Sequence, residues 1–218
     1  MACLPRYFRS FLCALAVTSA LSTAAQAAVL YAQAPLDAGE AIEAEYSIAG
    51  FFGFQNADAF SLAGPSTVTG FRWWGTEVSD VSLFVVRLFD DVATAPDTFD
   101  TLGGSIIARP TSLTDSAATP IFEFDLTLST PLQLDGSAYL SVFLDTDQEF
   151  WFWLESAEGD SVSAFRGVDG DVWAMLPPDL AFAVTGEAVT QGVPEPGALA
   201  LLGIAALAGL AGRRKHAV

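Results

Sequence analysis

The clearest pattern in the chain is a strict alternation of apolar and polar residues over residues 120–129, PIFEFDLTLS. Phenylalanine and leucine fill the apolar positions, and acidic or hydroxyl-bearing residues lie between them. Since successive side chains of a strand point to opposite faces, this pattern predicts a strand with Phe124 inside and Glu123 outside. Similar apolar-rich runs occur at residues 66–75, 81–91, 137–146, 149–156, 171–176 and 179–188.

Short strands separated by turns predict the fold class. In residues 66–75, STVTGFRWWG, alternation predicts that Val68, Gly70, Arg72 and Trp74 share one face. The turn sequences LDGS and VDG separate neighbouring runs, and residues 93–104 are predicted to form a loop. No stretch between the two chain ends shows the 3.6-residue period of an amphipathic helix. We therefore predict an all-β protein, an antiparallel β-sandwich of jelly-roll-like type.

The first 27 residues have the features of a secretory signal peptide. Arg6 and Arg9 precede the apolar run FLCALAV, and a stretch of small residues ends in AAQA. Ala25 and Ala27 form the Ala-x-Ala site, so cleavage is predicted after Ala27. The Sec machinery would then export the body, residues 28–192, across the inner membrane.

The last 26 residues, 193–218, predict a removable membrane anchor. The uncharged run 198–212 would make a helix about 23 Å long, against roughly 30 Å for a bilayer core, so it is a marginal transmembrane helix. The basic cluster at residues 213–215 should stay on the cytoplasmic side. The triplet Pro194-Glu195-Pro196 keeps the preceding backbone extended, as a membrane-embedded protease requires.

This tail, VPEPGALALLGIAALAGLAGRRKHAV, resembles the PEP-CTERM sorting signal of Gram-negative bacteria. The order of Pro-Glu-Pro, apolar helix and the arginines Arg213 and Arg214 is the order in that family. The resemblance implies processing by an exosortase, transient anchoring in the inner membrane, and delivery to the cell surface or extracellular matrix. The segments TVTGFRWWGT, FVVRLFDD, YLSVFLD, WFW and DLAFAVTGE also resemble the β-rich body domain common in such proteins.

Charge excludes several partners. Between residues 28 and 192 the chain has four arginines against 25 acidic residues, a net charge of −21. Nucleic acid and anionic membrane surfaces need a basic patch, which this composition does not supply. We expect a soluble exported body that binds no nucleic acid.

The residue inventory also excludes most catalytic chemistry. Both cysteines lie in the signal peptide, and the single lysine and histidine, Lys215 and His216, lie in the tail. The body therefore lacks the residues for Ser-His-Asp, Cys-His, Schiff-base and histidine–metal sites. We expect no enzyme activity, and only a carboxylate-pair glycosidase remains open.

Two acidic groups are candidate calcium ligands. Asp145, Asp147 and Glu149 recur at every second position, and Asp169 and Asp171 flank a glycine. Carboxylate oxygens suit Ca²⁺, but neither group has the glycine and terminal bidentate glutamate of a calcium loop. We favour solvated turns and no cofactor, with Ca²⁺ as the alternative.

Tryptophan provides the candidate sugar-binding surface. Trp151 and Trp153 lie two residues apart on one strand face, and Trp73 and Trp74 point to opposite faces. Exposed indoles can stack on sugar rings, whereas buried ones would belong to the core. The neighbouring phenylalanines, Phe150 and Phe152, compete for the same inner face, so one of the two pairs must be partly exposed.

These observations lead to one favoured function and one alternative. The favoured interpretation is a non-catalytic β-sandwich at the cell surface or in the extracellular matrix, sorted through its Pro-Glu-Pro signal. The alternative is a carbohydrate-binding module that acts on exopolysaccharide, with or without calcium.

Overall fold

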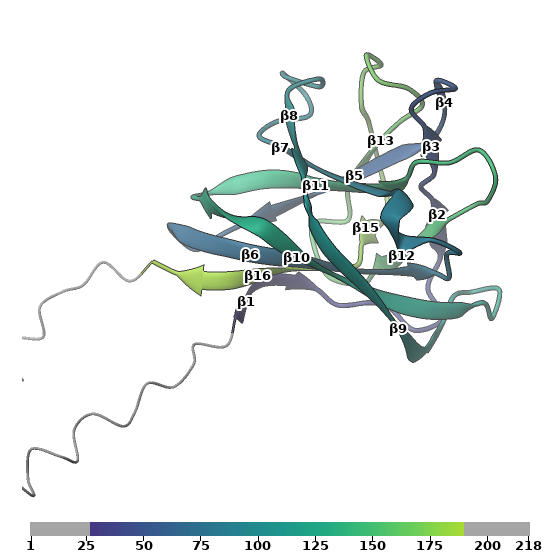
Figure 1. The fold of residues 1–218 in the computed structure, drawn as a ribbon, viewed down its shortest axis with the longest axis horizontal. Coiled ribbons are helices and arrows are strands. Elements are labelled where there is room, and N and C mark those ends of the chain that lie inside the picture. The colour runs from purple at the N-terminus through teal and green to yellow at the C-terminus, as the bar shows by residue number, and fades with distance from the viewer. Residues whose placement is uncertain (1–26, 190–218) are drawn as a thin grey trace, which may run out of the picture.

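The computed structural model describes residues 27–189, which form two antiparallel sheets packed face to face (Figure 1). The eight-stranded sheet contains β1 (Ala28–Gln33), β2 (Ala41–Glu43), β6 (Ser66–Thr76), β9 (Gly104–Thr114), β10 (Pro120–Leu134), β12 (Phe152–Ser156), β15 (Asp179–Leu180) and β16 (Phe182–Ala188). The six-stranded sheet contains β5 (Gln55–Ser61), β7 (Phe84–Phe89), β8 (Phe99–Leu102), β11 (Ser137–Leu144), β13 (Ser163–Arg166) and β14 (Ala174–Leu176). A short hairpin, β3 (Tyr46–Ser47) with β4 (Phe52–Gly53), and a single 3₁₀ turn, η1 (Val81–Leu83), complete the described part.

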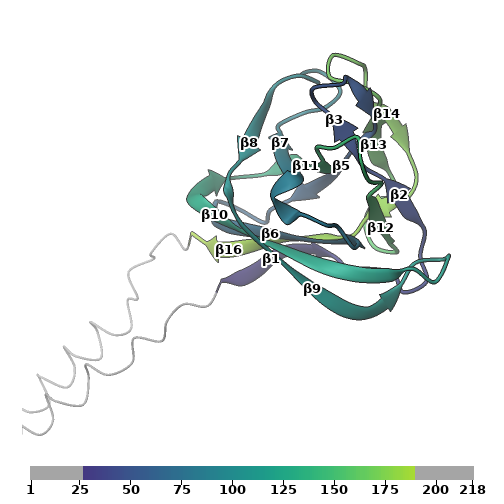
Figure 2. The same ribbon diagram turned by 45° about the vertical axis from the view of Figure 1, so that its right-hand side comes forward.

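The pairing pattern shows how the chain folds over on itself. Four pairs join an earlier strand to a later one: β1 with β16, β5 with β11, β6 with β10, and β7 with β8. Alternate pairs fall in opposite sheets, and β16 then pairs with β6 while β11 pairs with β7. The chain is therefore a long hairpin that curls so that its alternate pairs face one another (Figure 2).

Most of the predicted strands are present, and the prediction of an all-β protein is confirmed. The run at 81–91 begins with η1 before it becomes β7, and the run at 179–188 divides into β15 and β16. Eight strands were not predicted from the sequence: β1, β2, β3, β4, β5, β8, β9 and β13.

The predicted face of β6 is wrong at its start. Val68 is fully buried together with Phe71 and Trp73, whereas Arg72 and Trp74 are partly exposed. The reason is an extra residue, Thr69, because the partner strand β16 passes directly from Thr185 to Gly186 while β6 passes from Gly70 to Val68. Such a β-bulge moves every residue before it to the opposite face.

The predicted loop at 93–104 is only partly a loop. Residues 99–102 form β8, which pairs with β7 and places Phe99 opposite Phe89. As an edge strand, β8 has exposed polar residues and too few apolar ones to show in the hydrophobic pattern. The remainder is fixed over the outer face of the sheet, because Arg166 Nη1 and Trp173 Nε1 both donate to Pro96 O.

An aromatic cluster fills the space between the sheets. The Phe84 ring lies 4.8 Å from the Phe124 ring and 4.9 Å from the Trp151 ring, both in edge-to-face geometry. The Trp73 ring stacks on Phe124 at 5.9 Å. Such pairs add to the free energy gained by burying their large apolar surface.

We predict that Phe124→Ala lowers the free energy of unfolding by about 3–5 kcal/mol, because the side chain is fully buried in this cluster. Its neighbour Glu123 points outward and makes ion pairs with Arg72 and Arg109 at 3.5 and 3.3 Å. Such part-exposed pairs contribute about 1 kcal/mol or less, so Glu123→Ala is the matched control. Urea melts measure both values, and equal losses would contradict the assigned faces.

Candidate functional site

Three of the four candidate sugar-binding tryptophans lie in the core. Trp73, Trp151 and Trp153 are 0% exposed, so the expectation that they offer a stacking surface is wrong. Trp151 Nε1 donates to Thr76 O at 3.1 Å, and Trp153 Nε1 donates to Ala181 O at 2.8 Å. Burial of a large indole with its N–H satisfied is the lower-energy arrangement.

The two phenylalanines beside them point outward instead. Phe150 is 69% exposed and Phe152 is partly exposed, so one pair of this run faces solvent, as the alternation required. Trp74 is also partly exposed and lies on the outer face of the eight-stranded sheet, opposite Glu123 of β10. The aromatic surface is therefore present, but mostly on different residues from those predicted.

The three carboxylates of the first candidate calcium group, Asp145, Asp147 and Glu149, each accept hydrogen bonds from a different partner. Asp145 Oδ1 accepts the backbone N–H of Ile48 at 2.9 Å. Glu149 Oε1 accepts the Ser79 hydroxyl at 2.8 Å, and Asp147 accepts from the side chain of Gln148. Within residues 27–189 there is no group of three or more acidic, histidine or cysteine residues arranged to hold a metal ion.

The second candidate group is part of an ion-pair network. Asp169 Oδ1 accepts from Arg87 Nη1 at 2.8 Å and from Arg166 Nη2 at 2.6 Å. Burial would raise the pKa of Asp169, but the hydrogen bonds from Arg87 and Gln55 and the two arginine charges hold it below its usual value. Asp171 accepts the N–H of Val168 instead, and among residues 27–189 these two carboxylates belong to no cluster that could hold a metal ion.

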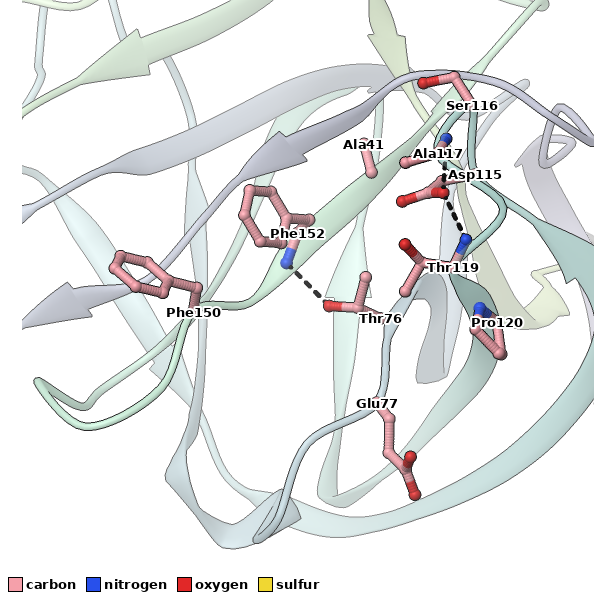
Figure 3. A pocket seen from close by; sticks show the side chains of 10 residues that line it. All are labelled: Ala41, Thr76, Glu77, Asp115, Ser116, Ala117, Thr119, Pro120, Phe150 and Phe152. Atoms are coloured by element: carbon pink, nitrogen blue, oxygen red, sulfur yellow. Dashed lines mark hydrogen bonds between the residues drawn. The ribbon is translucent and has the colours of Figure 1, made fainter.

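A cavity of about 510 Å³ lies at one end of the sandwich (Figure 3). Its volume is within the range of roughly 300–1,000 Å³ that is usual for ligand sites. Its lining residues come from β2, the end of β6, the β9–β10 turn and the start of β12: Ala41, Thr76, Glu77, Asp115, Ser116, Ala117, Thr119, Pro120, Phe150 and Phe152. The rings of Phe150 and Phe152 lie on one side, facing the turn that carries Asp115.

A rigid turn fixes Asp115 in the cavity wall. Its Oδ1 accepts the backbone N–H groups of Ala117 and Thr119 at 2.9 and 2.7 Å, and its own N–H donates to Thr119 O at 3.0 Å. The turn is tied to the preceding loop, because Ser116 N donates to Gly39 O at 2.7 Å. Asp115 is only 8% exposed, and within the described residues its Oδ2 has no hydrogen-bond partner.

That free oxygen points toward the aromatic side of the cavity, in the direction of Phe152 (Figure 3). Thr76 Oγ1 accepts the N–H of Phe152 at 3.1 Å, which leaves the hydroxyl hydrogen of Thr76 available to a ligand. The cavity thus combines apolar ring faces with hydroxyl groups and an unused carboxylate oxygen.

The basic residues of the described part are all engaged elsewhere. Arg72 and Arg109 pair with carboxylates on the outer face of the eight-stranded sheet, and Arg87 and Arg166 pair with Asp169. None of them lines the cavity. An anionic ligand would therefore meet two carboxylates and no basic side chain among the lining residues.

Two carboxyl groups with strongly raised pKa values lie away from the cavity. Burial and the neighbouring Glu43 raise the pKa of Glu45 to about 7. Burial also raises the pKa of Asp58 to about 8, with a contribution from the nearby Asp179. Neither Glu45 nor Asp58 lines the cavity, so they do not supply an acid–base pair to it.

The sequence did not predict Asp115 or Glu77 as site residues. The signal that was available is the short sequence DSAATP at residues 115–120, which is typical of a turn closed by an aspartate side chain. Its significance depends on Phe150 and Phe152, which are distant in sequence and become neighbours only in the fold.

The predicted processing residues at the chain ends lie mostly outside the described part. Pro194, Glu195, Pro196, Arg213 and Arg214 all lie outside residues 27–189. Ala25 lies outside it too, and Ala27 is the first described residue, so signal cleavage remains a prediction.

Comparison of the chain with known families gives one result for this tail. A family model of the PEP-CTERM protein-sorting motif matches residues 192–215. The chain carries a PEP-CTERM sorting motif. A PEP-CTERM motif is recognised by exosortase, and it implies an exported protein with a C-terminal membrane-anchoring region before processing. No curated protein and no solved structure matches the chain significantly.

The membrane-anchoring region implied by the PEP-CTERM motif falls on residues that the structure does not describe. Within residues 27–189, no helix is long and apolar enough to cross a membrane. The predicted span at residues 198–212 lies outside this part, so its helical structure remains a prediction.

Proposed function

We propose that this protein is exported by the Sec machinery across the inner membrane of a Gram-negative bacterium, held there briefly by its tail, and released by exosortase to the cell surface or extracellular matrix. The single observation that carries this proposal is the PEP-CTERM motif at residues 192–215. The signal-peptide pattern before Ala28 supports the same route.

The body would act there as a non-catalytic jelly-roll domain, a structural or adhesive component of the matrix. The four strand pairs formed by a curled hairpin support the jelly-roll assignment, since eight strands in two such layers define that fold. The body has no cysteine, histidine or lysine, which supports a role without catalysis.

Carbohydrate binding is the second candidate function, and the cavity favours it. A sugar ring has an apolar face and a rim of hydroxyl groups, which correspond to the Phe150 ring and to the hydroxyl and carboxylate groups opposite. Single sites of this kind are weak because hydroxyl groups must give up water, so affinity would come from many sites on one polymer. A glycan array with and without EDTA would test this function and its dependence on calcium.

We predict that the mature protein lacks the end of its tail. Intact-mass analysis of the surface-delivered protein should give a mass without residues 213–218, because cleavage near the Pro-Glu-Pro triplet removes the anchor. A variant with Pro194, Glu195 and Pro196 all changed to alanine should keep its tail and remain in the membrane fraction. A surface-delivered form that still contains residues 213–218 would contradict the proposed processing.

A further inference from the structure

The free oxygen of Asp115 is the polar group of the cavity that a ligand can reach most directly. The two oxygens of this carboxylate differ, because Oδ1 is occupied by the N–H groups of Ala117 and Thr119, whereas Oδ2 has no protein partner within the described residues. The turn holds Oδ2 toward the cavity, so a ligand group that enters beside Phe152 can donate to it (Figure 3).

The surroundings indicate the charge of that ligand group. Glu77 adds a second carboxylate to the lining, and no arginine reaches the cavity. The body as a whole has a net charge of −21, so acidic ligands are repelled before they arrive. The faces of Phe150 and Phe152 carry negative potential, which attracts a cation rather than an anion.

The shape and polarity of the lining indicate the rest of the ligand. Ser116 and Thr119 add hydroxyl groups beside Asp115, and within residues 27–189 neither hydroxyl makes a hydrogen bond of its own. A lysine side chain also carries an ammonium group, but its alkyl chain has no group that could form hydrogen bonds with these hydroxyls. A pyranose ring offers them several hydroxyl partners and presents an apolar face to Phe150.

We propose that this cavity binds an amine-bearing sugar unit, with its ammonium group at Asp115 Oδ2 and its ring against Phe150. The proposal rests on the second candidate function, carbohydrate binding, and adds the class of sugar. The ammonium group forms a charge-assisted hydrogen bond with Asp115, which is stronger than one from a neutral hydroxyl. An N-acetylated sugar with the same ring lacks that charge and binds less tightly.

The test compares two tetramers that differ only at nitrogen: glucosamine tetramer and its fully N-acetylated counterpart. Binding to the full-length protein in detergent is measured by calorimetry at mildly acidic pH, where the amines are protonated. The expected result is that the glucosamine tetramer binds about ten-fold or more tightly than the acetylated one.

The variant Asp115→Asn keeps the shape of the side chain, and its remaining oxygen can still accept the two N–H groups of the turn. It should lower the affinity for glucosamine tetramer about ten-fold or more. The matched control is Asp135→Asn, an exposed residue in the β10–β11 turn that changes the net charge by the same amount. Phe150→Ala should weaken both tetramers, because the ring face serves either sugar.

Four outcomes would overturn the proposal. If Asp135→Asn weakens binding as much as Asp115→Asn, the attraction comes from net charge and not from the cavity. If the acetylated tetramer binds equally well, carbohydrate binding stands but the amine preference is wrong. If neither tetramer binds, both the preference and the second candidate function are wrong, whereas export through the PEP-CTERM motif is unaffected. If trilysine binds in an Asp115-dependent way and the glucosamine tetramer does not, the ligand is a peptide.

Discussion

Trp153→Ala is expected to lower the free energy of unfolding by about 3–5 kcal/mol. Its ring is fully buried against Trp151 and Phe182, each with ring centroids 6.3 Å away, and its N–H is satisfied by Ala181 O. Truncation removes these contacts and leaves a cavity between the two sheets. Urea melts followed by circular dichroism give the loss, and the double variant with Trp151→Ala should be largely unfolded.

Phe150→Ala is the control for this prediction, because it removes an aromatic ring from the same run but from the exposed side. At 69% exposure, Phe150 contributes little to packing, and its loss should change stability by about 0.5 kcal/mol or less. A large loss for Phe150→Ala together with a small one for Trp153→Ala would show that the strand presents its opposite face to the core.

Raising the pH from about 4 to about 9 is expected to destabilise the body, through Asp58 above all. Burial raises the pKa of this carboxyl from 3.8 to about 8. Between these values the unfolded chain has lost the Asp58 proton while the folded protein still holds it, so stability falls as the pH rises. The contribution is complete below about pH 4 and lost above about pH 8, and four pKa units correspond to on the order of 5 kcal/mol. Glu45, with its pKa raised to about 7, acts in the same direction.

The variant Asp58→Asn separates the effect of the hydrogen bonds that Asp58 accepts from the effect of the proton that it binds. In the folded protein, Asp58 accepts the N–H of Ala59 at 2.7 Å and that of Leu180 at 2.6 Å. Asparagine can accept only one of them, so the variant should be less stable than the wild type at pH 4 by about 1–3 kcal/mol. It should be the more stable protein at pH 9, because it has no proton to lose. Stability curves that stay parallel across this range would show that the Asp58 proton is not linked to folding.

Period-two alternation predicted those strands that have one buried face. Phe124 and Glu123 lie on the predicted sides of β10, since nothing interrupts the alternation near them. In β6 the extra residue Thr69 reverses the faces before it, and no local pattern distinguishes a bulge from a regular strand. β8 and β9 were missed because they are edge strands and mostly exposed, so their sequences lack the alternation of apolar and polar residues that a buried face produces.

The candidate site was harder to predict for a different reason. Tryptophan was the predicted ligand surface because an exposed indole can stack on a sugar ring, but a large indole is also favoured in the core, and three of the four candidates are buried there. The cavity is assembled from four segments that are distant along the chain, at residues 41, 76–77, 115–120 and 150–152. Only the pairing of β6 with β10 and the approach of β12 to both β2 and β6 bring them together.

The arrangement of β16 and β6 determines how the body would respond to force. Ala188, where the chain leaves the body toward the tail, pairs with Ser66 at one end of β6, and the cavity residue Thr76 lies at the other end. These ends are about 33 Å apart at 3.3 Å per residue. A pull between the C-terminal end of the body, at Ala188, and a polymer held in the cavity therefore runs along the strands. The ladder bonds of β16 to both β1 and β6 are then loaded in shear and must break together, whereas pulling the two chain ends apart would peel β1 from β16 one bond at a time.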